Sequence, residues 1–327
     1  MIKFLVIRFS SIGDIVLTTP VVRLLKQKYP DSEIHYLTKK QFSFLLENNP
    51  YVDKTIGLDQ NLKTIITDLK DELYDYVIDL HNNIRTRRIK STLKIPDFTI
   101  DKLNVKKWLL VNLKINKLPQ KHIVDRYLDT LSVFDIKNDN QPLDYFIPEG
   151  DNYVFSDQYQ GFKEQKYIAF VIGATYYTKQ IPQELAVNIM NKSGLPFVLL
   201  GGKDDVEKSK LIEKALKIPV VNLCGAINLN QSASVIKNAK IVVTSDTGLM
   251  HIAAAFKKPI VSIWGNTVPK FGMSPYLPHS ASKIIENKAL KCRPCSKIGF
   301  DKCPKKHFDC MLKIDANSIA EYLKNLF

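Results

Sequence analysis

The 327-residue sequence contains no apolar run long enough to form a transmembrane helix. The short apolar stretch at residues 4–7 ends at Arg8, and no small-residue cleavage site of the kind found in signal peptides follows it. We therefore expect the protein to stay in the cytoplasm.

Cysteine is also scarce, with five residues in the whole chain. Four of them lie close together in sequence, between residues 292 and 310. So few cysteines in a chain of this length argue against a disulfide-stabilised secreted protein and are typical of a reducing compartment.

Glycine is sparse where a nicotinamide cofactor would need it. The turn after the first predicted strand, residues 9–14, contains a single glycine, Gly13. The dinucleotide-binding fingerprint requires three glycines at this place, because the backbone there must approach a pyrophosphate closely. A Rossmann dehydrogenase is therefore disfavoured.

Positive charge, in contrast, is abundant, and the formal net charge is +14 at pH 7. An excess of this size indicates an acidic partner, which can be nucleic acid, an anionic membrane surface or a phosphorylated substrate. The basic residues are scattered, with modest clusters at 85–90, 102–107 and 302–306, and no basic motif interleaved with aromatic residues is present. This pattern argues against nucleic-acid binding.

The distribution of apolar residues predicts two α/β halves, each with a parallel sheet. Strands are expected at 2–9, 33–37 and 76–80, and helices at 15–28, 42–48, 62–72 and 122–134. After a polar, turn-rich linker at 135–151, strands are expected at 167–172, 196–200, 220–223, 241–244 and 260–264. Helices are expected there at 182–191, 205–216 and 232–238, from about residue 247, and at 316–326. We place the domain boundaries at 1–148 and 149–327.

The most informative stretch is residues 241–269, IVVTSDTGLMHIAAAFKKPIVSIWGNTVP. A β-branched strand runs into Ser-Asp-Thr-Gly, which is a helix-start signal, and a second strand follows the helix. The first N–H groups of a helix lack intrahelical partners and carry the positive end of the helix dipole, so this turn can bind a phosphate.

Two other loops also follow predicted strands, SSIGD at residues 10–14 and GATYYTK at residues 173–179. Ligands of open α/β sheets bind outside the carboxyl ends of the strands. If both halves face one cleft, a carboxylate, a lysine and an anion-binding helix end meet there.

Four segments together resemble glycosyltransferase family 9, the heptosyltransferase family of lipopolysaccharide core assembly. They are FLVIRFSSIGDIVLTTPVVRLLKQKYP, IGATYYTKQIP, SDTGLMHIAAAFKKPIVSIWGNTVP and the terminal CRPC…C…HFDCM. The resemblance implies an α/β GT-B fold, in which two facing Rossmann-like domains with parallel sheets enclose an interdomain cleft. It also implies a nucleotide-sugar donor on the C-terminal domain, an acceptor on the N-terminal domain and inversion at the anomeric carbon.

Carried over by position, the resemblance makes Asp14 the catalytic base and Lys179 a cation that contacts the donor diphosphate. The other implied donor-binding residues are Ser10, Ser11, Gly13, Thr175, Asp205 or Glu207 for the ribose, Asp246, Thr247, Gly248 and His251. The chemistry fits independently, because a sugar hydroxyl needs a carboxylate to take its proton while cations and helix N–H groups stabilise the leaving diphosphate. No metal is needed for this.

The same resemblance implies that Arg85, His122 and Arg126 bind the acceptor. The alternative for His122 and Arg126, which stand at helical spacing, is an exposed polar face. Simpler roles are open for the donor-side residues as well. Asp14 or Asp246 can act only as a helix cap, Lys179 as a solvated loop residue and His251 as a buried histidine with satisfied hydrogen bonds.

Cys292, Cys295, Cys303 and Cys310, with His307 among them, offer enough soft ligands for a structural zinc ion, although their spacing departs from common zinc-finger patterns. The alternative is a loop that packs reduced cysteines. Cys224 stands alone in an apolar segment and is expected in the core.

The sequence thus predicts an inverting, metal-independent glycosyltransferase at the inner membrane face, with ADP-heptose as donor and a lipopolysaccharide core or related lipid-linked glycan as acceptor. One alternative is a GT-B transferase that uses another nucleotide sugar. The other is a non-catalytic nucleotide-binding, membrane-associated scaffold. Release of nucleotide from a donor separates an enzyme from a scaffold.

Overall fold

The computed structural model describes residues 1–327 except 60, 156–158, 160–161 and 163–165. The chain forms two compact units, one from Met1–Leu103 with Gln120–Phe146 and the other from Asn104–Pro119 with Ile147–Phe327. Residues 104–119 precede the predicted linker in sequence, yet their contacts place them in the second unit.

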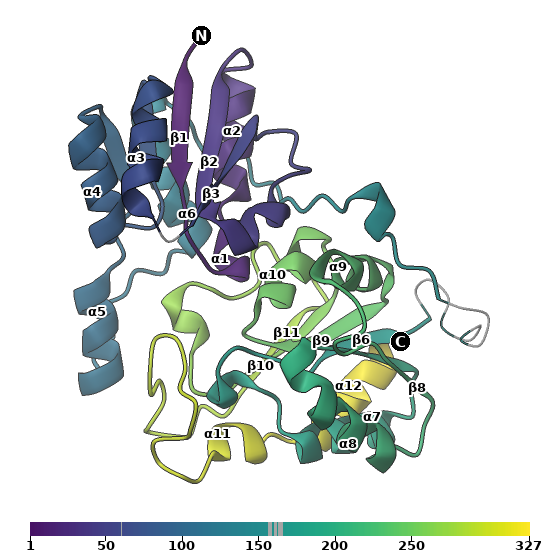
Figure 1. Ribbon diagram of the computed structural model, residues 1–327. Helices are drawn as coiled ribbons and strands as arrows, with labels where there is room; N and C mark the ends of the chain where they lie inside the picture. Colours follow the sequence, from purple (N-terminus) through teal and green to yellow (C-terminus); the bar gives the residue numbers. More distant parts are fainter. Residues whose placement is uncertain (60, 156–158, 160–161, 163–165) are drawn as a thin grey trace. The chain divides into compact units, whose positions relative to one another are not determined.

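The first unit contains a five-stranded parallel sheet in the order β3-β2-β1-β4-β5, of which Figure 1 labels β1, β2 and β3. Its strands are β1 (Lys3–Ile7), β2 (Glu33–Lys39), β3 (Lys54–Leu58), β4 (Tyr76–Asp79) and β5 (Asp97–Thr99). Its helices are α1 (Ile12–Val16), α2 (Thr19–Lys28), α3 (Leu62–Asp71), α4 (Ile84–Leu93) and α6 (Ile123–Leu128), with 3₁₀ turns η1 (Lys40–Leu45) and η3 (Asp129–Phe134).

The central strand β1 owes its place to its composition. Phe4, Leu5, Val6 and Ile7 are all fully buried. Such a continuous apolar run suits a parallel strand that is covered on both faces, with β2 on one side and β4 on the other. Functional side chains can therefore appear only after β1 ends, at Arg8 and beyond.

The second unit contains a six-stranded parallel sheet in the order β11-β10-β9-β6-β7-β8. Its strands are β6 (Ile168–Val171), β7 (Phe197–Leu200), β8 (Val220–Asn222), β9 (Ile241–Ser245), β10 (Ile260–Trp264) and β11 (Lys283–Glu286). Its helices are α5 (Asn104–Trp108), α7 (Gln183–Ser193), α8 (Val206–Ala215), α9 (Leu229–Asn238), α10 (Gly248–Ala255), α11 (Asp309–Leu312) and α12 (Ala316–Leu326). Its short helical turns include η2 (Leu109–Leu113, π-helical), η4 (Glu149–Asp151), η6 (Tyr177–Lys179), η7 (Lys203–Asp205) and η8 (Pro269–Phe271).

The expected fold class is confirmed, since both units are Rossmann-like α/β structures with fully parallel sheets. The expected helix at 15–28 is in fact two helices. The chain leaves α1 at Leu17, Thr18 turns its hydroxyl back to the Ile15 carbonyl, and α2 restarts at Thr19 with Pro20 in its first turn. Within the described residues, no helix has the length and apolar character needed to span a bilayer.

Six helices and strands of the described residues were not predicted, namely β3, β5, α4, α5, β11 and α11. Three of them lie at sheet edges, β3 and β5 in the first unit and β11 in the second. An edge strand is half covered and needs no continuous apolar run, so its sequence lacks the signal that identified the central strands.

The packing of α2 against residues 139–144 generates a stability prediction. The Arg23 side chain, 5% exposed, pairs with Asp139 (3.1 Å) and Asp144 and donates to the Pro142 carbonyl (2.9 Å). Arg23→Ala leaves two partly buried carboxylates without their cation, so we expect a loss of about 3 kcal/mol in the free energy of unfolding. Urea denaturation measures it. The exposed pair Lys210–Glu207 is the matched control, and Lys210→Ala should cost less than about 0.5 kcal/mol. Equal losses for the two variants would contradict the prediction.

Candidate functional site

In the first unit, polar groups gather where β1 and β4 end. Arg8 Nη2 pairs with Asp14 Oδ1 at 2.7 Å, and Asp14 Oδ2 accepts hydrogen bonds from Ser11 N (3.2 Å) and Ser11 Oγ (3.0 Å). Arg8 in turn donates to the Ser10 and Leu80 carbonyls. The Asp14 carboxylate is thereby fixed in position, while one-fifth of its side chain remains exposed.

Asp14 also takes part in a helix cap. It is the third residue of α1, and its contacts with Ser11 form a capping box at the start of that helix. Burial alone would raise the pKa of the Asp14 carboxyl, but the Arg8 charge and the Ser11 hydrogen bonds together hold this pKa below its usual value. Asp14 is thus ionised at neutral pH.

Sequence reasoning missed Arg8 and His81. The His81 ring packs on Phe9, with centroids 4.9 Å apart, and its Nδ1 has no hydrogen-bond partner among the described residues. Burial lowers the pKa of His81 to about 4, and the charges of Arg8 and Lys102 add to this effect. The signal available in the sequence was its position, because His81 directly follows the buried run that ends at Leu80.

The three predicted acceptor residues also lie in the first unit, but in different surroundings. Arg85 is exposed on the first turn of α4. His122 is the N-cap of α6, where its Nδ1 accepts from Val124 N at 3.2 Å. Arg126 is buried and donates to the Asp101 carbonyl, so it does not lie on an exposed polar face.

In the second unit, the loops after β6, β9 and β10 meet through side chains. Lys179 Nζ, in η6, lies 2.6 Å from Asp246 Oδ2, and the Thr267 hydroxyl donates to the same oxygen at 2.9 Å. The Lys179 and Asp246 side chains are 18% and 11% exposed, respectively. Lys179 is thus held in place by an ion pair and is not a freely solvated loop residue.

Helix α10 begins beside this ion pair. Thr247 is its N-cap and accepts from Met250 N at 3.4 Å, and Gly248 is its first residue. Asp246 is therefore not the cap, which leaves its carboxylate for Lys179 and Thr267. His251 is buried within α10.

Two further residues at the same strand ends were missed. In the described part of the chain, Ser245 Oγ and both amide atoms of Asn266 are buried without a hydrogen-bond partner. Ser245 ends β9, and Asn266 follows the neighbouring strand β10 by two residues. Buried polar groups are normally paired, so these atoms indicate a place where a bound polar molecule or water completes the bonding.

Thr175 and Lys179 lie on a loop that is braced from the C-terminal segment. Thr178 N donates to the Phe300 carbonyl (3.1 Å), and Phe300 N donates back to the Thr178 hydroxyl (2.8 Å). Gly299 has φ +135° and packs against the Tyr176 side chain, where any larger residue would collide. The bracing fixes the backbone from which Lys179 reaches Asp246.

Asp205 and Glu207, which were not distinguished by sequence, have different surroundings. The Asp205 carboxylate is buried, accepts from Gly202 N at 2.8 Å and lies against Gly173, where an added Cβ would overlap it. The Glu207 side chain is exposed on α8 and pairs with Lys210.

The cysteine-rich segment contains Cys292 Sγ 3.9 Å from His307 Nε2, and Cys310 is buried. Among the described residues, no group of three or more His, Cys, Asp or Glu side chains is arranged to hold a metal ion. The expected zinc site at Cys292, Cys295, Cys303 and Cys310 is therefore not confirmed. All five cysteines are free thiols, and Cys224 is buried as expected.

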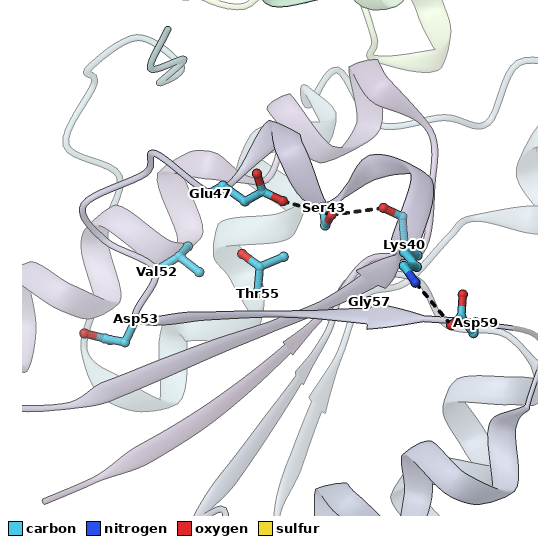
Figure 2. A pocket seen from close by; sticks show the side chains of 8 residues that line it. All are labelled: Lys40, Ser43, Glu47, Val52, Asp53, Thr55, Gly57 and Asp59. Atoms are coloured by element: carbon cyan, nitrogen blue, oxygen red, sulfur yellow. Dashed lines mark hydrogen bonds and ion pairs between the residues drawn. The ribbon is translucent and has the colours of Figure 1, made fainter. Parts of the chain in front are cut away.

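A pocket of about 410 Å³ lies elsewhere in the first unit and contains none of the predicted site residues. Figure 2 shows Thr55 and Gly57 on β3, and Ser43, which bonds to the Glu47 carboxylate and the Lys40 carbonyl. Three carboxylates and one lysine line it: Glu47, Asp53, Asp59 and Lys40. This acidic lining is unsuited to a diphosphate, so we do not assign donor binding to this pocket.

The Arg8–Asp14 pair makes stability depend on pH. Because the folded-state pKa of Asp14 is lowered, its charge stabilises the fold above the unfolded-state pKa of about 3.9, and this contribution is lost as the pH falls through the folded-state pKa. The difference in unfolding free energy between wild type and Asp14→Asn should be constant above about pH 5 and shrink below about pH 4. Urea denaturation across this range measures it, with exposed Asp204→Asn as control. If the difference in unfolding free energy between wild type and Asp14→Asn does not change with pH, the Asp14 charge does not stabilise the fold.

Comparison with known proteins identifies the family. Residues 63–305 match the sequence model of glycosyltransferase family 9 (heptosyltransferase). Lipooligosaccharide heptosyltransferase 2 of Haemophilus influenzae is 28% identical, covering 91% of this chain and 93% of that protein.

Solved structures show the same fold. A family 9 glycosyltransferase from Veillonella parvula has a TM-score of 0.78 at 20% identity, covering 99% of this chain and 96% of that one. The E. coli ADP-heptose lps heptosyltransferase II has a TM-score of 0.71 at 24% identity, covering 99% and 98%. The family match spans most of the chain and includes the loops that carry Lys179 and Asp246, and the chain is therefore a glycosyltransferase that belongs to family 9.

Proposed function

We propose that the protein transfers heptose from ADP-heptose to a lipopolysaccharide core or related lipid-linked acceptor, with inversion at the anomeric carbon. The observation that carries the proposal is the Lys179–Asp246 pair beside the start of α10. The choice of heptose and of ADP in this proposal comes from the names of two similar proteins. One is the Haemophilus influenzae heptosyltransferase, and the other is the E. coli ADP-heptose heptosyltransferase.

In this proposal the second unit binds the donor. This unit contains the predicted C-terminal domain, residues 149–327. Lys179 and the first N–H groups of α10 neutralise the diphosphate, and Thr175 adds a hydroxyl on the Lys179 loop. Asp246 holds Lys179 in position and presents its carboxylate to donor hydroxyls. Asp205 is the better candidate for the ribose, because the Glu207 side chain is exposed and occupied by Lys210.

Asp14, in the first unit, is the proposed base. A carboxylate with a lowered pKa is always ionised at neutral pH but is a weak base. It therefore takes the acceptor proton late, as the new glycosidic bond forms and the hydroxyl becomes acidic. Ser10, Ser11 and Gly13 shape the loop that aims it. Inversion requires the acceptor hydroxyl to reach the anomeric carbon from the face opposite the departing diphosphate.

The first unit, including most of residues 1–148, binds the acceptor in this proposal. Arg85 is the residue best placed to meet acceptor phosphates, because it is exposed on α4. Arg126 is buried on the Asp101 carbonyl and His122 caps α6, so both would act by fixing the backbone around them. Neutral His81, with an unpaired ring nitrogen, is suited to hydrogen-bond a sugar hydroxyl.

The proposed transfer needs no cofactor. Lys179 and the α10 terminus supply positive charge where the diphosphate leaves, which is the function a divalent cation performs in other transferases. The enzyme works in the cytoplasm, at the inner face of the membrane that holds its lipid-linked acceptor, and binds no nucleic acid.

The test is transfer itself. Asp14→Asn should lower kcat by roughly 10²–10⁴-fold while donor affinity stays close to wild type, because Asn keeps the shape of Asp but cannot accept a proton. ADP release, with ADP-heptose and a heptose-free lipopolysaccharide acceptor in the presence of EDTA, measures kcat, and calorimetry measures donor affinity.

Asp204→Asn, on an exposed surface, is the matched control and should leave kcat unchanged. A kcat equal to that of the wild type in Asp14→Asn would rule out Asp14 as the catalytic base. Transfer from a UDP- or GDP-sugar, with none from ADP-heptose, would show that the proposed donor is wrong. Binding of nucleotide sugars without transfer from any of them would favour a non-catalytic scaffold.

A further inference from the structure

Residues 104–119 form a surface segment with an unusual combination of exposed apolar side chains and positive charge. Val105, Trp108, Leu113 and Ile115 are 73%, 56%, 53% and 45% exposed. The segment contains four lysines, Lys106, Lys107, Lys114 and Lys117, and no acidic residue occurs between Asp101 and Asp125. We call residues 104–119 the basic apolar segment.

The inner side of this segment is firmly attached to the second unit. Leu110, with Val111 and Leu118 beside it, packs in one apolar cluster with Val268 and Phe271. Lys114 Nζ donates to the carbonyls of Cys292 (3.1 Å) and Pro294 (2.7 Å). The exposed residues are therefore held outward by the fold, with the buried positions already filled.

The outward side has the composition of a membrane-interface helix. Val105 and Trp108 stand three residues apart on α5 and so lie on the same face, while Lys106 and Lys117 are exposed nearby in sequence. Tryptophan prefers the headgroup level of a bilayer, and lysines beside exposed apolar side chains gain from anionic lipids.

We propose that the basic apolar segment docks the protein on a bilayer containing anionic phospholipids. Lipid headgroups complement its charge, and the acyl boundary accommodates Val105, Trp108, Leu113 and Ile115. The inference rests on the proposed function, since an enzyme acting on a lipid-linked acceptor works at such a surface. A second copy of this chain is a poorer occupant, because equivalent surfaces would bring lysines against lysines.

The two tryptophans provide a direct probe. Trp264 is 1% exposed in the core, whereas Trp108 is 56% exposed on the segment. Vesicles of phosphatidylcholine with roughly one-third phosphatidylglycerol should bind the protein and shift its fluorescence to the blue, and vesicles of phosphatidylcholine alone should bind it at least tenfold more weakly. High salt should weaken the binding.

Two variants test the two contributions. Trp108→Ser with Leu113→Ser removes apolar contact, and Lys106→Glu with Lys117→Glu reverses charge. Each should reduce partition onto the anionic vesicles by at least roughly tenfold. The matched control, Leu211→Ser with Lys214→Glu on exposed α8 positions, should bind like wild type. Thermal unfolding checks that every variant is folded.

All variants should retain transfer to a delipidated, water-soluble acceptor. Wild-type vesicle binding by both segment variants, or equal binding to neutral and anionic vesicles, would overturn the proposal. A dimer that Trp108→Ser with Leu113→Ser converts to a monomer would overturn it too, by assigning the surface to a second copy. Vesicle binding without any sugar transfer would refute the proposed function alone, and transfer without vesicle binding would refute this inference alone.

Discussion

The ion pair between Lys179 and Asp246 is the interaction on which the proposed donor site depends. It exists because β6, β9 and β10 are parallel and end at the same edge of one sheet, so that three loops distant in sequence meet there. Asp246 alone would repel a diphosphate, and Lys179 alone would be mobile. Together with Thr267 they form a fixed group beside the N-terminus of α10, whose dipole adds positive potential there.

The cysteine-rich segment, residues 292–310, supports the loops that carry this group, which gives the segment a structural role. Phe300 and Gly299 hold the loop that carries Lys179. The buried guanidinium of Arg293 donates to the carbonyls of Trp264 and Thr267 and pairs with Glu286, so it fixes the loop after β10. Pre-positioning of this kind spares the site from reorganising when the donor's charge shifts in the transition state.

The sequence predicts the central strands because their continuous apolar runs reflect burial on both faces of the sheets. It predicts most helices because their apolar residues recur at helical spacing. It placed Asp14, Lys179 and Asp246 correctly after strand ends. It did not find Arg8, His81 or Asn266, because their neighbours are distant in sequence. It did not distinguish Asp205 from Glu207, because the sequence does not show that the first is buried and the second is exposed. It also assigned residues 104–119 to the first domain, since packing on Val268 and Phe271 is a long-range contact with no local signature.

Hydrogen–deuterium exchange with and without ADP tests the central claim most directly, because it reports where the nucleotide binds without a need for turnover. We predict slower amide exchange in peptides covering residues 173–180, 245–250 and 264–268, which are the loops after β6, β9 and β10. Exchange around the acidic pocket at Lys40 and Asp59 should not change. Protection confined to that pocket, or no protection of the three loops at saturating ADP, would contradict the account.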